Sequence, residues 1–311
     1  MDKNAKIFVA GRRGLAGSAL VRRLRAAGYD NLLLPARAEL DLTRQAETTG
    51  FLGREKPDYV FLAAGRVGGI AANSGFKAEF LYQNLMIEAN VVHAAWLAGV
   101  NRLLFLGSSC IYPRDCPQPI REEYLLTGPL EVTNDAYAIA KIAGLKMCES
   151  YNRQYGTAYV SVMPANLYGP NDNYDPETGH VLPALIRKAH EAKVSGREEL
   201  AVWGTGGPRR EFLHADDLAA ACVFLMERED IRSGTFNVGT GKDISIRELA
   251  ELIARTVGFS GKIVLDPSRP DGTPRKLLDA GKIAALGWRP SIGLAAGLGR
   301  TYADFLAGGR A

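Results

Sequence analysis

The chain has 311 residues, of which 47% are apolar and 23% are charged, as is usual for a globular protein. Lysines and arginines number 38 against 34 acidic residues, and the resulting net charge of +4 argues against a dedicated nucleic-acid-binding protein. The four cysteines form no CxxC pair and only four histidines are present, so we expect neither a disulfide scaffold nor a metal site.

The N-terminal segment and the longest apolar run indicate where the protein works. Residues 1–6 lead directly into the apolar segment 7–10, without the hydrophobic stretch of a signal peptide. The longest apolar run, 218–226, is too short to cross a bilayer. We therefore expect a cytoplasmic protein that does not contact a membrane.

The first half of the chain alternates short apolar runs with amphipathic stretches, which is typical of βαβ units and a parallel sheet. In chain order the pattern predicts a strand at 7–10, a helix at 18–27, strands at 32–34 and 59–63, a helix at 79–98, a strand at 103–107, a helix at 136–155 and a closing strand at 159–163.

The second half has a different texture. Residues 168–180 are rich in Gly, Pro, Asn and Asp and predict a long loop, and a second loop is expected at 203–207. Helices are predicted at 181–192, at 216–227 and from Ser245, where Glu248 completes a capping box, with a strand at 235–238. We expect an α/β fold in which a Rossmann-type parallel sheet, with helices on both faces (1–165), precedes a smaller C-terminal α/β substrate lobe (166–311), with segments at about 210–240 returning to the first domain.

Three glycines follow the first predicted strand in the pattern G-x-x-G-x-x-G. Gly11, Gly14 and Gly17 would allow a tight turn, close approach of a pyrophosphate and packing of helix on strand. The N-terminus of the helix that follows would offer free N–H groups to the anion. This placement predicts a dinucleotide-binding turn.

The end of the second strand bears on the choice between NAD and NADP. Arg37 stands where an acidic residue would bind a ribose 2′-hydroxyl, and Arg13 can converge on the same 2′-phosphate. We therefore expect a preference for NADP(H). If the strand ended one or two residues later, Glu39 would take this position and favour NAD.

Three further residues indicate redox chemistry at a carbonyl. Tyr137 and Lys141 share one face of a predicted helix, where the ammonium would lower the pKa of the phenol and make it a usable proton donor. Ser108 follows the strand at 103–107, at the carboxyl end where ligands bind open parallel sheets, and can donate a hydrogen bond to a substrate carbonyl oxygen.

With these residues in place, the chain resembles the extended short-chain dehydrogenases/reductases and, within them, the GDP-L-fucose synthase family. The resemblance covers nearly the whole chain. It includes GRRGLAGSAL (11–20), AAGRVGGIAAN (63–73), LYQNLMIEAN (81–90), LLFLGSSCIYP (103–113), YAIAKIAGLKMCESYNRQYG (137–156), MPANLYGPNDNYDP (163–176), GHVLPALIRK (179–188), REFLHADDLA (210–219) and PDGTPRKLLD (270–279).

The resemblance implies NADPH-dependent epimerisation of C3 and C5, and reduction of C4, of GDP-4-dehydro-6-deoxy-D-mannose to give GDP-L-fucose. It implies that Cys110 is the base and His180 the acid of the epimerisation. In the reduction Tyr137 would protonate O4 while Ser108 holds this oxygen, and Lys141 would bind the nicotinamide ribose.

The resemblance also implies binding residues and a partner. At the cofactor it implies Gly11, Arg12, Arg13, Gly14, Leu15, Ala16, Gly17, Arg37, Asp41, Leu42, Ala63, Ala64, Leu106, Gly107, Ser108, Ser109, Lys141, Pro164, Ala165, Asn166, Leu167 and His180. At the GDP-sugar it implies Lys188, Trp203, Arg210 and Asp271, although the family often carries arginine where this chain has Lys188. By the same analogy the helices at 79–98 and 136–155 pair with those of a second copy in a homodimer.

Two other functions stay open. A sugar-nucleotide 4-epimerase or 4,6-dehydratase of the same fold would keep Ser108, Tyr137 and Lys141 but recycle a tightly held NAD, without net consumption of NADPH. A non-catalytic NADP-sensing protein would keep only the glycine turn.

Overall fold

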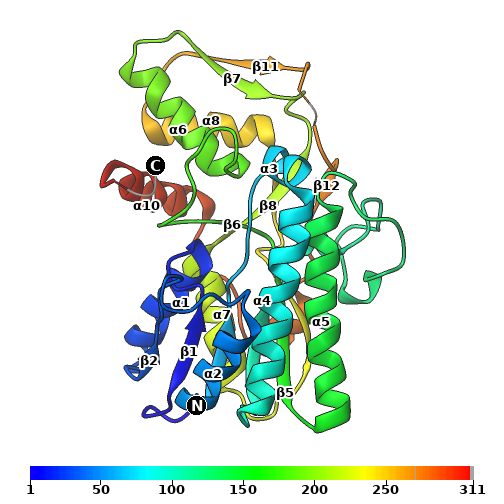
Figure 1. Cartoon of the computed structure of the whole chain (residues 1–311). Coiled ribbons are helices and arrows are strands. Elements are labelled where there is room, and N and C mark those ends of the chain that lie inside the picture. Colours follow the sequence, from blue (N-terminus) through cyan, green and yellow to red (C-terminus); the bar gives the residue numbers. More distant parts are fainter. Residues whose placement is uncertain (270, 309–311) are drawn as a thin grey trace.

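The computed structural model describes residues 1–269 and 271–308 (Figure 1). Its centre is a six-stranded sheet in the order β2-β1-β3-β4-β5-β9, in which every pairing is parallel. The strands are β1 (Ile7–Ala10), β2 (Leu32–Leu33), β3 (Tyr59–Leu62), β4 (Arg102–Leu106), β5 (Ala158–Pro164) and β9 (Gly234–Val238). The predicted Rossmann-type fold is confirmed.

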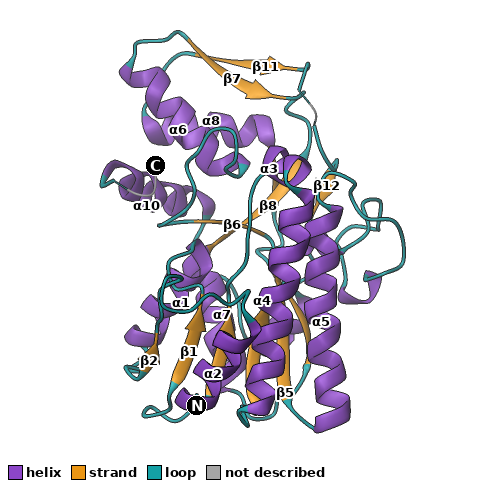
Figure 2. Ribbon diagram, viewed as in Figure 1, coloured by secondary structure: helices purple, strands orange, loops and turns teal. Residues whose placement is uncertain are grey.

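Helices cover both faces of this sheet, as Figure 2 shows. One layer contains α2 (Gln45–Glu55), α4 (Lys77–Leu97) and α5 (Asp135–Tyr155), and the other contains α1 (Leu15–Ala26) and α7 (Ala215–Glu227). Short elements connect them: the helix α3 (Ile70–Gly75) and the 3-10 turns η1 (Ser109–Ile111) and η2 (Glu122–Tyr124). Parallel strands buried on both faces explain why β1 reads as a continuous apolar run rather than as an alternating one.

The remaining elements lie beyond the carboxyl ends of the central strands. The outermost pair is β7 (Glu199–Trp203) with β11 (Lys262–Asp266), next to the helices α6 (Val181–Val194), α8 (Ile246–Val257) and α10 (Leu294–Leu306). A connecting sheet consists of β6 (Asn166–Tyr168), β8 (Arg209–His214), β10 (Asp243–Ser245) and β12 (Arg275–Lys276). The exception is α9 (Gly281–Ala285), which packs beside β9 and contributes Ile283 to the core around the central sheet. The buried apolar residues of β7 and of the outer helices belong mostly to a separate cluster.

Two sequence predictions need correction, and one helix was not predicted. The helix expected from Ser18 begins at Leu15, because Gly14 already serves as its N-cap. Trp203 ends the unpredicted strand β7 instead of opening a loop. The helix α2 was also missed, because its amphipathic pattern is weak and only two of its residues are buried.

Other details agree with the sequence. Ser245 and Glu248 form the predicted capping box at the start of α8, and Cys148 and Cys222 are buried in the core. In the described residues, no helix combines the length and hydropathy needed to span a membrane.

Candidate active site

A cavity opens at the carboxyl ends of β1 and β3, where the glycine turn lies. Of the residues expected at the cofactor, the cavity is lined by Gly11, Arg12, Arg13, Gly14, Arg37, Asp41, Leu42, Ala63 and Ala64. The others lie outside its lining: Leu15, Ala16 and Gly17 belong to α1. The rest are found from the ends of β4 and β5 through α5 and β6 to the start of α6, namely Leu106, Gly107, Ser108, Ser109, Lys141, Pro164, Ala165, Asn166, Leu167 and His180. Sequence reasoning missed Arg66, Gln83 and Ile87, which also line it.

The glycine turn is built for a close approach of backbone and ligand. Gly11 has φ +88°, and a Cβ there would lie 2.8 Å from the backbone of Ala63 and Ala64. A Cβ on Gly17 would collide with the carbonyl oxygen of Gly11, so helix and turn touch directly. The buried Nε of Arg12 has no hydrogen-bond partner in the described residues. An unsatisfied guanidinium nitrogen beside a side-chain-free turn fits an anionic dinucleotide.

The two carboxylates near the second strand are occupied within their own turn. Glu39 accepts a hydrogen bond from the backbone N–H of Ala36 (2.5 Å), and Asp41 accepts from the N–H and hydroxyl of the Thr that follows two residues later. Glu39 is absent from the cavity lining, whereas Arg13 and Arg37 both belong to it. Of the two alternatives left open by the sequence, this arrangement favours a 2′-phosphate over a bare ribose hydroxyl.

Ser108, Tyr137 and Lys141 come together where β4 ends against α5. Ser108 caps η1, and its Oγ accepts from the N–H of Cys110 (3.2 Å). Tyr137 is buried, with its ring edge-on to Phe80. The ammonium of Lys141 donates to the backbone carbonyl of Leu106 (3.0 Å) and lies 5.8 Å from the centroid of the Tyr137 ring.

The pKa of Tyr137 is raised, whereas the sequence analysis predicts that it is lowered. Burial raises the pKa of the phenol above its ordinary value, as do the neighbouring Cys110 and Glu88, and only the Ser108 hydroxyl acts in the opposite direction. The predicted lowering by Lys141 is not seen, because the ammonium contacts the buried carboxylate of Glu88, at 3.0 Å.

Cys110 stands between the core of the first domain and the connecting sheet. Its Sγ accepts hydrogen bonds from Asn134 Nδ2 (3.4 Å) and from Lys276 Nζ (3.6 Å). It packs on a small apolar cluster that includes Phe80 and Tyr137. The sulfur therefore has two N–H donors and an aromatic side chain beside it.

His180 is held in place by a contact between two loops. It is the N-cap residue of α6, and it follows Gly179, whose carbonyl oxygen leaves no space for a Cβ on Gly69. The N–H of Gly69 donates to the carbonyl of Thr178 (2.8 Å). His180 is an exposed residue, but the protein around it limits the solvation of the imidazolium. This desolvation and the Lys276 ammonium both lower the pKa of His180. Lys276 therefore acts on both the thiol and the imidazole.

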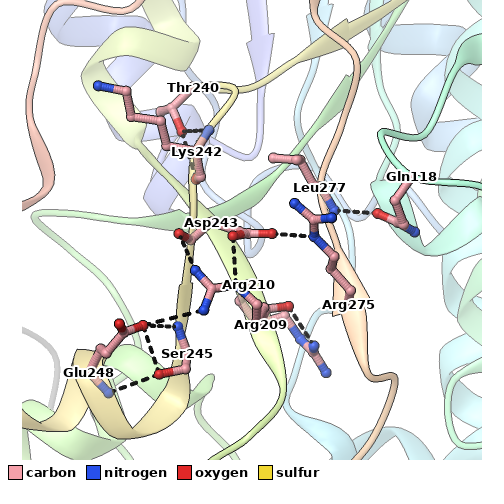
Figure 3. Close-up of polar contacts among 10 residues, drawn as sticks. All are labelled: Gln118, Arg209, Arg210, Thr240, Lys242, Asp243, Ser245, Glu248, Arg275 and Leu277. Atoms are coloured by element: carbon pink, nitrogen blue, oxygen red, sulfur yellow. Dashed lines mark hydrogen bonds and ion pairs between the residues drawn. The ribbon is translucent and has the colours of Figure 1, made fainter.

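Strand pairing explains why Lys276 reaches this position. Asp243 on β10 accepts hydrogen bonds from Arg209 on β8 and Arg275 on β12, which ties the three strands together (Figure 3). Burial opposes ionisation of Asp243, but its two arginine partners hold its pKa below the ordinary value. The register then pairs Arg210 with Lys276. Sequence analysis could not place this segment, because the pairing is long-range.

Of the residues expected at the nucleotide, Lys188 lies on α6, Trp203 ends β7 and Asp271 contacts the loop after β7. The ring of Trp203, 39% exposed, has Lys188 Nζ 4.4 Å and Arg269 Cζ 4.9 Å from its centroid. Burial and Arg269 lower the pKa of Lys188. Asp271 accepts from the N–H and hydroxyl of Thr205 (2.7 and 2.8 Å). An aromatic face with cations beside it suits a nucleobase and a diphosphate.

The fold and site define an extended short-chain dehydrogenase/reductase. Its features are the parallel sheet in this strand order, the glycine turn after β1, the serine after β4, the Tyr–x3–Lys helix and the added lobe over the strand ends. The chain belongs to the NAD dependent epimerase/dehydratase family, which it matches over residues 7–239. It is 59% identical to GDP-L-fucose synthase 1 of Arabidopsis thaliana (98% of this chain, 94% of the relative) and 53% identical to GDP-L-fucose synthase of Escherichia coli K12 (97% and 96%). Among solved structures it is similar to a GDP-mannoheptose C4 reductase from Campylobacter jejuni with NADP bound, with a TM-score of 0.90 and 42% identity over 98% of this chain and 99% of the other.

Proposed function

We propose that this chain binds NADPH and converts GDP-4-dehydro-6-deoxy-D-mannose into GDP-L-fucose, by epimerising C3 and C5 and then reducing the C4 ketone. The observation that carries the proposal is that Cys110 lies next to Ser108 and Tyr137, and that Lys276, which donates to Cys110, also acts on His180. The identity above 50% with relatives named GDP-L-fucose synthase supports it.

The epimerisation uses the acidity that the C4 ketone gives to the neighbouring C–H groups. Cys110, whose Sγ accepts hydrogen bonds from Asn134 and Lys276, removes the proton as the base and leaves an enolate. His180 returns a proton to the opposite face of the ring, which inverts the carbon. Desolvation and the positive charge of Lys276 lower the pKa of His180, which favours release of its proton.

The reduction uses the group at the end of β4. When bound, NADPH supplies the hydride that adds to C4, and residues of the glycine turn with Arg13 and Arg37 would hold it. Tyr137 donates a proton to O4, and Ser108 donates a hydrogen bond to this oxygen. Lys141, whose ammonium lies near the cavity-lining Gly65, would hold the ribose.

The experiment is an incubation of the protein with GDP-4-dehydro-6-deoxy-D-mannose and NADPH. We expect loss of absorbance at the nicotinamide wavelength, one equivalent for each GDP-L-fucose formed. A 4-epimerase or 4,6-dehydratase would show no net consumption of NADPH, and a sensing protein would bind NADPH without turnover of any keto sugar. A product with the epimerised carbons unchanged would indicate a C4 reductase only.

We also propose that the protein is a cytoplasmic homodimer that buries the outer faces of α4 and α5. Large apolar side chains remain exposed there, namely Tyr82 (62%), Leu97 (54%) and Ile139 (48%). Exposed apolar groups on two adjacent helices are typical of an interface with a second copy. Ile139→Glu should convert a dimer into a monomer in sedimentation analysis, and a wild-type monomer would refute the proposal.

A further inference from the structure

Two buried charged side chains meet behind the cofactor cavity. Glu88 on α4 and Lys141 on α5 are 1% and 4% exposed, and Glu88 Oε1 lies 3.0 Å from Lys141 Nζ. The ammonium also donates to the carbonyl of Leu106 (3.0 Å). Because removal of either charge from water is costly, burial of both requires that each compensate the other.

The packing of the two helices reserves space for the carboxylate. Gly144 lies on α5 close to the turn after Lys141, and a Cβ there would be 2.5 Å from Glu88 Oε2 and 2.6 Å from Phe105 Cζ. Any larger residue at this position would displace the carboxylate or the ring. The small residue on α5 and the acid on α4 are therefore complementary.

The pair lies directly against the cofactor cavity. Ile87, next to Glu88 in the sequence, lines the cavity, and so does Gly65, where a Cβ would be 3.6 Å from Lys141 Nζ. The ammonium thus has the cavity on one side and the carboxylate on the other. Sequence reasoning had no signal for this contact, since it joins two helices that are distant in the chain.

Among the described residues, Tyr137 and Cys148 on α5 respond to the charge of Glu88, and Cys110 after β4 lies next to Tyr137. Burial raises the pKa of Glu88 itself, and the charge and hydrogen bond of Lys141 act in the opposite direction. Burial is the main cause of the raised pKa of Tyr137 and of Cys148, and the charge of Glu88 raises both further. Glu88 therefore acts on the phenol directly as well as through Lys141.

We propose that Glu88 is a positioning residue for the reduction, which keeps the Lys141 ammonium charged and fixed between the cofactor and Tyr137. The inference rests on the proposed function. Without the carboxylate, the buried ammonium has no counter-ion and releases its proton at lower pH. The phenol meanwhile loses a neighbouring negative charge and becomes more acidic. Both effects move the alkaline limit of reduction to lower pH.

The test compares Glu88→Gln, which keeps the shape but removes the charge, with the wild type and with Glu79→Gln, an exposed control on the same helix. With the keto sugar and NADPH between pH 6 and 10, we expect the alkaline limb of kcat to move down by at least one unit and the rate at pH 9 to fall at least tenfold. Glu88→Asp, which retains the charge, should restore part of this. Exchange of the C3 and C5 hydrogens with D2O, measured with NADP+, should change less than twofold.

Two results would overturn the proposal. One is an unchanged alkaline limb in Glu88→Gln, and the other is an equal loss of exchange and reduction, which would indicate a merely structural role. Titration of NADPH by protein fluorescence supplies a readout that needs no sugar: Glu88→Gln should weaken binding at least threefold at pH 9 but not at pH 7. If the wild type fails to turn over the keto sugar, the proposed function is refuted. The titration still tests the role of Glu88, because equal NADPH affinities of Glu88→Gln and the wild type at both pH values would refute that role.

Discussion

Replacing Asp172 by asparagine should change how the stability of the protein depends on pH. Asp172 lies in the loop that leads to His180 and is 3% exposed. Its Oδ1 accepts from the N–H of Asn173 (2.8 Å), but in the described residues its Oδ2 has no partner. Burial raises the pKa of Asp172 to about 7, and the nearby Asp304 adds to this, against a smaller effect of the Asn173 bond.

The direction of this pH dependence follows from the difference between the pKa of Asp172 in the folded and unfolded states. In the unfolded chain the carboxyl has a pKa of about 3.9, so ionisation there begins roughly three units earlier than in the fold. A raised folded pKa gives a contribution that is fully present below pH 4 and is lost as the pH rises through 7. Three units correspond to about 4 kcal/mol, and about 2–3 kcal/mol of this is lost between pH 5 and 8.

Urea unfolding of both proteins between pH 5 and 8.5 measures this effect. The free energy of unfolding of Asp172→Asn should gain on that of the wild type as the pH rises, by about 2–3 kcal/mol over the range. Asp175→Asn is the matched control in the same loop, because hydrogen bonds from Thr178 hold the pKa of Asp175 below its ordinary value, so its curve should run parallel to the wild type. A parallel curve for Asp172→Asn as well would refute the reasoning.

Three further predictions concern the cofactor, the base and the glycine turn. Arg37→Ala should raise KM for NADPH at least tenfold and leave that for NADH within about twofold, in steady-state kinetics; an equal effect on both would argue against a phosphate contact. Cys110→Ser should slow the exchange of the C3 and C5 hydrogens with D2O roughly a hundredfold or more. Hydride transfer to an already epimerised ketone, measured in a single turnover, should slow far less. Unchanged exchange would show that the thiol is not the base. Gly17→Ala should abolish NADPH binding in a fluorescence titration and lower Tm, because its Cβ collides with the carbonyl oxygen of Gly11. The control is Gly50→Ala on α2, where a Cβ would have nothing within 4 Å, and it should raise the free energy of unfolding by about 0.5–1 kcal/mol.

Local patterns made much of the fold predictable. The capping box of Ser245 and Glu248 and the apolar runs of β1 and β4 are specified by neighbouring residues, so their positions agreed with the sequence to within about one residue. By contrast, α2 has too few buried positions to show a helical period, and the pairing of β9 with β5 depends on residues some seventy positions apart.

The site shows the same division. Tyr137 and Lys141 share a helix and could be related by spacing alone, but the partner of that lysine could not be, because Glu88 comes from another helix. Lys276 reaches Cys110 only through the strand pairing of β12 with β8. The raised pKa of Tyr137 likewise depends on burial, which spacing along the chain does not reveal.

The late arrival of β9 has a consequence for how the chain acquires its structure. The ribosome must synthesise the chain up to Val238 before β9 can pair with β5. All seven residues of β5 are buried in the folded protein, but until β9 forms, the outer edge of this strand exposes unpaired N–H and C=O groups. An exposed apolar strand edge invites pairing with other chains. A truncated product that stops near residue 165 would therefore be prone to aggregate instead of forming a free-standing nucleotide-binding module, and nascent chains of this protein should depend on chaperones during that interval.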